Sequence, residues 1–441
     1  MRRENAAALL GLVFFLRGEF LQNSYFYTLP SVLFGPALWS LLLLLPLVLA
    51  LRGGPRPAEL NPWLWILVFI PPLTIWARPW PQHQAWTQAP GEVLHGAAVW
   101  ALGGAGFFLI ILISLPRISA KVSWSAGAVA LLFLIQQTWA AALHAWNQSR
   151  SDMLYVVDLG AKTLLHGKNP YVMRYGDLPF TYYPGYLMGY LPGAALGWDP
   201  RILAILYGAA ALALLGRLGK NFSPGSALGA SGIFLGNYLF TRDDLSTPWT
   251  WLLAGLTLAL QESSPWVAGA SWGFCLASRE WFWLLTPFWL AWLFQARSRA
   301  KAWAAIAAAG LTALVVGSPA ILGSTGSTTV LETTTYRFPG GGTVFTAGQI
   351  LGMQRHGLAW IFFYLGAGRW MLPACFLAWA VVLALYLRKT RTLADMAAWG
   401  ALSVAVFQIL CVPMEPYHFL FPAYLLLASA VLEEKAEVRL L

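Results

Sequence analysis

Charged residues are scarce in this chain: Asp, Glu, Lys and Arg make up 10% of the 441 residues, whereas 58% are hydrophobic. About a quarter of the residues in a soluble globular domain are charged, so this composition excludes that class. The mean hydropathy is +0.61, and many apolar runs reach the roughly 20 residues that cross about 30 Å of hydrocarbon. The runs lack the short alternation of an outer-membrane barrel. We therefore predict an all-α, polytopic integral membrane protein.

Cysteine is nearly absent, and Cys275, Cys375 and Cys411 lie in or beside apolar runs. An odd number of cysteines in hydrocarbon offers neither a disulfide framework nor a metal cluster. No group of His, Cys and Asp has the spacing of a metal site, so we expect chemistry without a metal or cofactor. The formal charge of +10 is spread over short loops, which indicates membrane topology and not binding of nucleic acid.

Short basic loops, such as those with Arg217 and Arg388, mark the cytoplasmic side and fix one alternating orientation. The apolar run 6–16 follows two arginines and has no small-residue cleavage site, so we interpret it as an uncleaved first span. Counting it gives about 13–14 spans and two cytoplasmic termini. The other spans are predicted near 31–51, 62–78, 95–115, 123–144, 202–219, 225–241, 246–261, 265–278, 281–296, 302–320, 371–387, 394–412 and 418–432.

This orientation places most of the remaining charged residues on the outer face. Two apolar pieces there, 185–197 and 357–368, are too short to span, so we predict interfacial or re-entrant helices. The outer segments are 145–201, 241–244, 321–370 and 414–418.

The first outer loop has the clearest local pattern. After Asp152, apolar residues follow helical spacing beside basic ones, which predicts a helix lying in the membrane interface. Gly167 is expected to end it, Asn169-Pro170 to make a turn, and Pro184 to start the next helix at its first position. Asp152 is then either a helix cap or a functional carboxylate, because a charge held at a membrane surface is costly.

The outer-face motifs, taken in order over about residues 145 to 432, resemble the polyprenol-phosphate-mannose-dependent mannosyltransferases, a GT-C family (glycosyltransferase family 87). The chain departs from that family at Gly185, where the family has a second proline, and at Arg279, where it has lysine. The motifs are Ser151-Asp152 with Tyr155, Gly167-Lys168-Asn169-Pro170-Tyr171, Thr181-Tyr182-Tyr183-Pro184, Thr241-Arg242-Asp243-Asp244, Ala277-Ser278-Arg279-Glu280 with Pro287, and Val412-Pro413-Met414-Glu415-Pro416-Tyr417-His418.

The resemblance implies a GT-C-like membrane region at 123–441, preceded by extra spans at 1–122. It implies a metal-independent, inverting enzyme that transfers a hexose, with mannose expected, from a polyprenyl phosphate to a glycan or lipid acceptor. The active site would face outward from the cell membrane. Asp152 is the expected base, since a positioned carboxylate can take the proton of the acceptor hydroxyl.

Three outer-face cations, Arg201, Arg242 and Arg279, are expected to bind the donor phosphate, because a guanidinium suits bidentate phosphate binding. Plainer roles stay open: Arg201 could snorkel from a helix start, and the other two could pair with adjacent carboxylates. Further residues expected to contact substrate are Tyr155, Asn169, Tyr171, Tyr182, Tyr183, Asp243, Asp244, Glu280, Glu415 and His418.

Two other functions remain open. The chief alternative is a transporter or flippase of a lipid-linked or polar solute, which usually carries ionisable groups near mid-membrane in related halves. The second is a surface-polysaccharide polymerase or ligase, which should concentrate its arginines in one large late loop. Here the charges gather at one face and the best motif lies in an early loop, which favours the glycosyltransferase.

Overall fold

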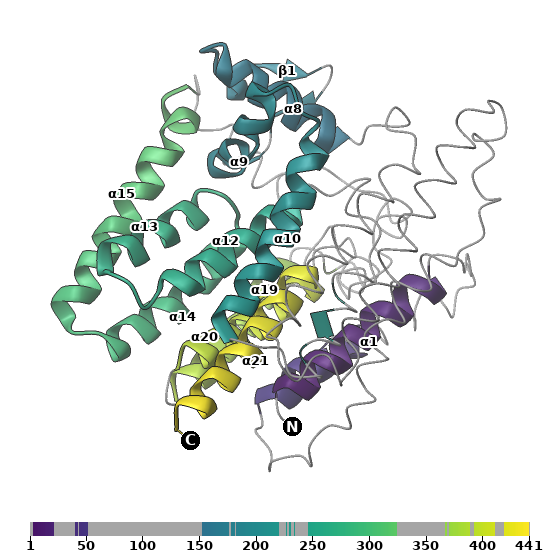
Figure 1. The fold of residues 1–441 in the computed structure, drawn as a ribbon, viewed down its shortest axis with the longest axis vertical. Coiled ribbons are helices and arrows are strands. Elements are labelled where there is room, and N and C mark those ends of the chain that lie inside the picture. The colour runs from purple at the N-terminus through teal and green to yellow at the C-terminus, as the bar shows by residue number, and fades with distance from the viewer. Residues whose placement is uncertain are drawn as a thin grey trace, which may run out of the picture.

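The computed structural model describes residues 3–21, 40–42, 44–51, 152–175, 178–180, 182–219, 246–323, 370–388, 392–410 and 419–440, with a few isolated positions between them. This part of the chain is helical apart from the short antiparallel pair β1 (Arg174–Tyr175) and β2 (Leu178–Pro179). The predicted all-α class is confirmed for these residues. The helices are α1 (Arg3–Leu21), α8 (Asp152–Leu165), α9 (Pro184–Ala195), α10 (Pro200–Gly219), α12 (Ser246–Leu260), α13 (Pro265–Leu276), α14 (Trp281–Ala296), α15 (Arg299–Gly323), α19 (Met371–Leu387), α20 (Leu393–Leu410) and α21 (Leu420–Leu440) (Figure 1).

From α10 onward, each described helix falls on a run that the hydropathy pattern marks as a span. Within the described ranges, two segments are long and apolar enough to cross a membrane, 299–318 in α15 and 393–410 in α20. The pair α9 and α10, bent by 117°, makes a third if it is one span. α13 has only 12 residues, about 18 Å of helix, which is short of the hydrocarbon thickness. The described helices thus support membrane association with far fewer full-length spans than the 13–14 predicted.

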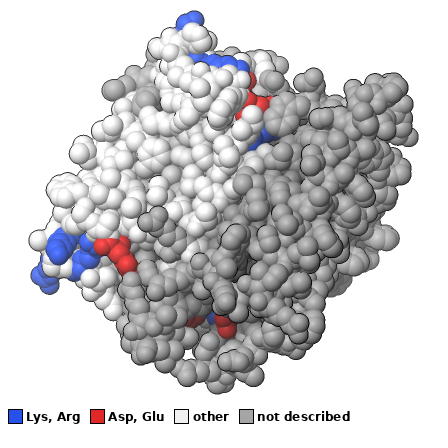
Figure 2. Space-filling model, viewed as in Figure 1, with Lys and Arg blue, Asp and Glu red and all other residues white. Residues whose placement is uncertain are grey.

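The elements α8, β1 and α9, which belong to the segment predicted as the first outer loop, gather at one end of the molecule, and both chain termini lie at the other (Figure 1). Among the described residues, Figure 2 shows charged side chains near the edges of this face and a broad surface of uncharged residues on its left side. Exposed large apolar side chains, such as Trp303, Leu311 and Val315 of α15, lie on the described surface. Such a distribution suits a helix bundle surrounded by hydrocarbon.

At the end that holds the termini, Arg3 of α1 is 8% exposed. Its guanidinium binds Asp395, which also caps the start of α20 by accepting from the Thr392 backbone N–H at 3.1 Å. Glu433 of α21 lies 3.8 Å from Arg3 Nε. The N-terminal helix, the start of α20 and the late part of α21 therefore meet at this end of the molecule.

Small residues let α13 and α15 approach closely. A methyl group added to Gly269 would lie 2.7 Å from the carbonyl carbon of Ala305, and one added to Gly273 would lie 2.9 Å from that of Ala309. Such contacts are too short for real carbon atoms. Glycines four residues apart against a facing row of alanines are typical of helix pairs in membranes, where close backbone approach supplies the packing energy.

We expect Gly269→Ala to lower stability, because either α13 or α15 must move to admit the methyl group, at a cost of about 1–3 kcal/mol. The matched control is Gly310→Ala on α15, where the added methyl group meets nothing within 4 Å and alanine favours the helix by about 0.5–1 kcal/mol. Thermal unfolding in detergent checks both. Equal melting temperatures for the two variants would contradict the close α13–α15 packing.

Candidate functional site

Asp152 is the first residue of α8. The predicted interfacial helix is therefore confirmed as a helix, and its start is where the sequence places it. The side chain of Asp152 lies outside the described residues, so its roles as cap and as base both stay predictions. α8 is anchored from both sides: Leu154 and Val157 pack into the main core, while Val156 and Ala161 pack into a smaller core under the loop.

The loop after α8 folds by local hydrogen bonds. Gly167 ends the helix region with φ +70, a conformation that glycine adopts without steric cost. Asn169 caps a short 3-10 helix, η3 (Pro170–Val172), by accepting from the Tyr171 backbone N–H at 2.9 Å. Tyr171 is 7% exposed, and its hydroxyl donates to the Tyr182 carbonyl at 2.8 Å. Asn169 and Tyr171 therefore hold the loop in shape, and their contact with substrate stays a prediction.

Tyr171 and Tyr182 belong to a continuous row of aromatic rings. Tyr182 and Tyr183 are half-buried, whereas Tyr155 on α8 is 39% exposed. Consecutive ring centroids are 4.9–6.0 Å apart, the spacing of favourable aromatic contacts. The row stiffens the path from the outer loop into the bundle. It runs Tyr171, Phe180, Tyr182, Tyr186, Tyr190, Tyr207, Trp249 and Phe274.

Two of the motif segments meet where α9 begins. Pro184 occupies the first turn of α9, as predicted, and Tyr183 makes no side-chain cap bond. The backbone N–H of Gly185 instead donates to the carbonyl of Ala277 at 2.8 Å. A methyl group at position 185 would lie 2.9 Å from that carbonyl oxygen and still closer to Ser278 Oγ. Gly185, which departs from the family pattern, therefore permits this close approach.

This contact places the turn between α13 and α14 beside the first loop. Arg279 in the turn is 5% exposed, and its backbone N–H donates to Cys275 O at 3.1 Å. Glu280 is the half-buried N-cap residue of α14 and makes no side-chain cap bond. Arg279 and Glu280 are thus held near Tyr182 and Tyr183, which the sequence separates from them by nearly a hundred positions.

Arg201 lies apart from Arg279 and Glu280, at the start of α10, and is 8% exposed. Its Nε and Nη2 donate to the two carboxylate oxygens of Asp199 at 2.8 and 2.6 Å. α9 has 12 residues, or roughly 18 Å, and Arg201 follows the end opposite to Gly185. Its role in phosphate binding stays a prediction, and a phosphate there would compete with Asp199.

Asp199 was not among the predicted site residues. The sequence feature that could have indicated Asp199 is its place just before the start of a helix, where aspartate often caps. In the structure its Oδ1 accepts from the Arg201 backbone N–H at 2.9 Å. Other predicted site residues, Arg242, Asp243, Asp244, Glu415 and His418, lie outside the described residues.

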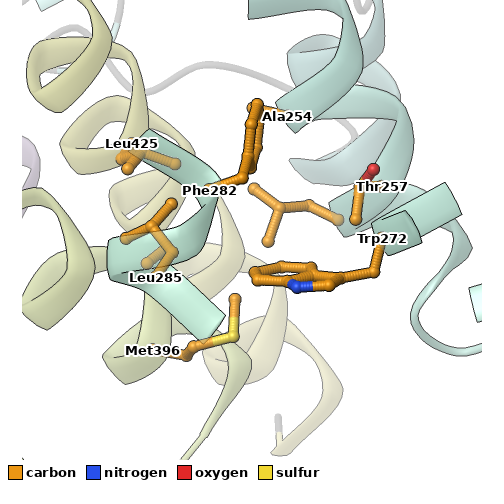
Figure 3. Close-up of a pocket in the computed structure, with 9 residues that line it drawn as sticks. Ala254, Thr257, Trp272, Phe282, Leu285, Met396 and Leu425 are labelled. Atoms are coloured by element: carbon orange, nitrogen blue, oxygen red, sulfur yellow. The ribbon is translucent and has the colours of Figure 1, made fainter. Parts of the chain in front are cut away.

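A cavity of about 20 Å³ lies inside the bundle (Figure 3). It has room for about one water molecule and none for a hexose. Its lining is apolar except for Thr257: Ala254, Thr257, Leu258, Trp272, Phe282, Leu285, Met396, Ala397 and Leu425. Within the described ranges, no three His, Cys, Asp or Glu side chains are grouped so that they could hold a metal ion.

No protein-family model matches this chain, no curated protein is significantly similar to it, and no solved structure matches it. The family interpretation therefore depends on the ordered motifs and on the arrangement described above.

We expect Gly185→Ala to destabilise the protein, because the new methyl group pushes α9 away from the α13–α14 turn. Ser278→Ala removes the nearest obstacle, so the double variant should recover part of the loss, with a coupling of about 0.5–3 kcal/mol. Thermal unfolding of the two single variants and the double variant measures this coupling. Strictly additive effects would show that Gly185 and Ser278 are not in contact.

Proposed function

We propose that this chain is a multi-pass GT-C-like glycosyltransferase of the cell membrane. It transfers a hexose, with mannose the expected sugar, from a polyprenyl phosphate to a glycan or lipid acceptor at the outer face. The observation that carries this proposal is that the segment ending at Pro184 and the segment with Arg279, both part of the resemblance, lie side by side, joined in this chain by the Gly185 to Ala277 hydrogen bond. A shared outward site would need these two segments to lie together.

In this proposal Asp152 takes the proton of the acceptor hydroxyl. The acceptor oxygen then attacks the anomeric carbon from the side opposite the phosphate, and the bond to the phosphate oxygen breaks with inversion. The leaving phosphate keeps the electron pair and needs no separate acid. Arg279, buried beside the first loop, stabilises the departing phosphate, since charge-assisted bonds gain strength away from water.

One described feature also fits the transporter alternative. α9 and α10 form a helix pair bent by 117°, and broken helices often surround transporter binding sites. α9 nevertheless lies where the sequence predicts an interfacial or re-entrant helix. Chemical consumption of the polyprenyl-phosphate sugar distinguishes the two functions, because a transporter leaves the molecule that it moves chemically unchanged.

The proposal is tested by incubating the purified protein with radiolabelled polyprenyl-phosphate mannose and other polyprenyl-phosphate hexoses, each with candidate glycan and lipid acceptors. We expect label to pass from donor to acceptor. Failure to bind or consume any such donor would instead support the transporter.

We expect Asp152→Asn to lower the transfer rate by roughly 10²–10⁴-fold, because asparagine cannot accept the acceptor's proton. Melting temperature and donor affinity should persist, since asparagine caps a helix about as well as aspartate. The control is Glu262→Gln, which removes a carboxylate from the exposed turn between α12 and α13. Near-normal turnover of Asp152→Asn at matched expression would leave Asp152 only a capping role.

We expect Arg279→Ala to weaken donor binding by roughly 10- to 100-fold, the loss of a charge-assisted contact of about 1.5–3 kcal/mol. The matched control is Arg299→Ala, which removes an exposed arginine at the start of α15. Donor affinity is measured by equilibrium binding, and melting temperature is measured in parallel. A lower melting temperature with unchanged donor affinity would make Arg279 a structural residue.

A further inference from the structure

Gln408 lies in the last turn and a half of α20 and is 0% exposed. Among the described residues, neither its Nε2 nor its Oε1 has a hydrogen-bond partner. A buried amide that makes no hydrogen bond is costly and uncommon in a native fold. The side chain is therefore a candidate for binding something other than the protein.

A second buried glutamine shows how this fold satisfies such a group. Gln261 is also 0% exposed, and its Nε2 donates to Thr257 O at 3.1 Å. Its Oε1 accepts from Trp289 Nε1 at 2.8 Å. A buried serine on the same helix as Gln408, Ser403, likewise donates to a backbone carbonyl, at 2.8 Å. Among the described residues, the Gln408 amide, which makes no hydrogen bond, thus differs from the buried Gln261 and Ser403 side chains, which do.

The contacts of neighbouring residues show where Gln408 lies along the bundle. Phe407 packs edge-on against Phe376 of α19, with centroids 5.3 Å apart. One turn later on α19, Trp379 donates to Leu284 O of α14 at 3.0 Å. Gln408 therefore lies near the level at which α14 begins, the end of the bundle that holds the α13–α14 turn.

The helix periodicity shows which face of α20 carries Gln408. Gln408 follows Ala397 by 11 residues, or three turns, so both lie on one face of α20. Ala397 lines the cavity between α12, α14 and α21, which Figure 3 shows inside the bundle. Gln408 thus shares the inward face, roughly 16 Å further along α20.

We propose that Gln408 binds hydroxyl groups of the hexose on the lipid-linked donor. This assignment rests on the proposed function. The amide offers two N–H donors and a carbonyl acceptor, and neighbouring sugar hydroxyls both donate and accept, so they satisfy both ends. A phosphate only accepts and would leave Oε1 without a partner, and an isoprenoid chain offers neither group. Gln408 therefore recognises the sugar, while Arg279 acts on the phosphate.

The test compares binding of polyprenyl-phosphate mannose with binding of sugar-free polyprenyl phosphate. Gln408→Leu and Gln408→Met are near-isosteric variants without the amide. We expect their Kd for the mannosylated lipid to rise roughly 5- to 100-fold, as for one or two lost hydrogen bonds, with no change for the sugar-free lipid. Their melting temperatures should equal or exceed that of the wild type, whereas the control Gln261→Leu should melt lower.

Each other outcome overturns the assignment. Unchanged affinity for both lipids refutes it and leaves the proposed function intact. A fall in melting temperature like that of Gln261→Leu, or an equal loss of affinity for both lipids, makes Gln408 a packing residue. Wild-type protein that binds neither lipid refutes the proposed function and this assignment together.

Discussion

In an apolar helix bundle, a buried polar group must find its partner in the protein or in a bound ligand, because the surrounding hydrocarbon offers none. The helices meet this constraint for most of the backbone, and aromatic donors meet part of the rest. Trp251 donates to Leu420 O at 3.0 Å and Tyr424 donates to Ala211 O at 3.2 Å, so each bond also links two helices. The start of α9 follows the same rule, with a carbonyl from another motif segment as the partner of a free backbone N–H. This hydrogen bond, which gives the Gly185 N–H an acceptor, also brings the α13–α14 turn to the start of α9, where the candidate site lies.

Close helix contact is the second determinant of this architecture. Gly185, Gly269 and Gly273 each face backbone atoms of another helix or turn, and no larger residue fits there. The large aromatic residues fill the space between the more distant helices, as in the stacked pair Trp272 and Trp289, 4.8 Å apart. Small residues thus allow some helices to approach closely, and aromatic residues fill the space between the helices that lie further apart.

The local features of the first loop were predictable because each depends on the chemistry of one or two residues. Gly167 at a positive φ and Pro184 in a first helical turn are of this kind, and hydropathy alone gave most helix boundaries. Contacts between distant segments were not predictable, since nothing in the sequence pairs Gly185 with Ala277. The pairing of Arg201 with Asp199 was not predicted, because the cation alone suggested phosphate binding and nothing in its pattern marked the aspartate as its partner. Gln408 was not predicted, because its burial and the lack of a hydrogen-bond partner depend on how α20 packs against the other helices.

Arg3 joins the beginning of the chain to its end. The guanidinium is held by Asp395, 392 positions later, and α1 packs along α21. Chains are synthesised at about 5–20 residues per second, so α1 exists for roughly 20–80 s before its partners emerge. During that interval Arg3 can interact only with water, lipid headgroups or the insertion machinery, because Asp395 has not yet been synthesised. The contact between Arg3 and Asp395 therefore forms only after nearly the whole chain has been synthesised.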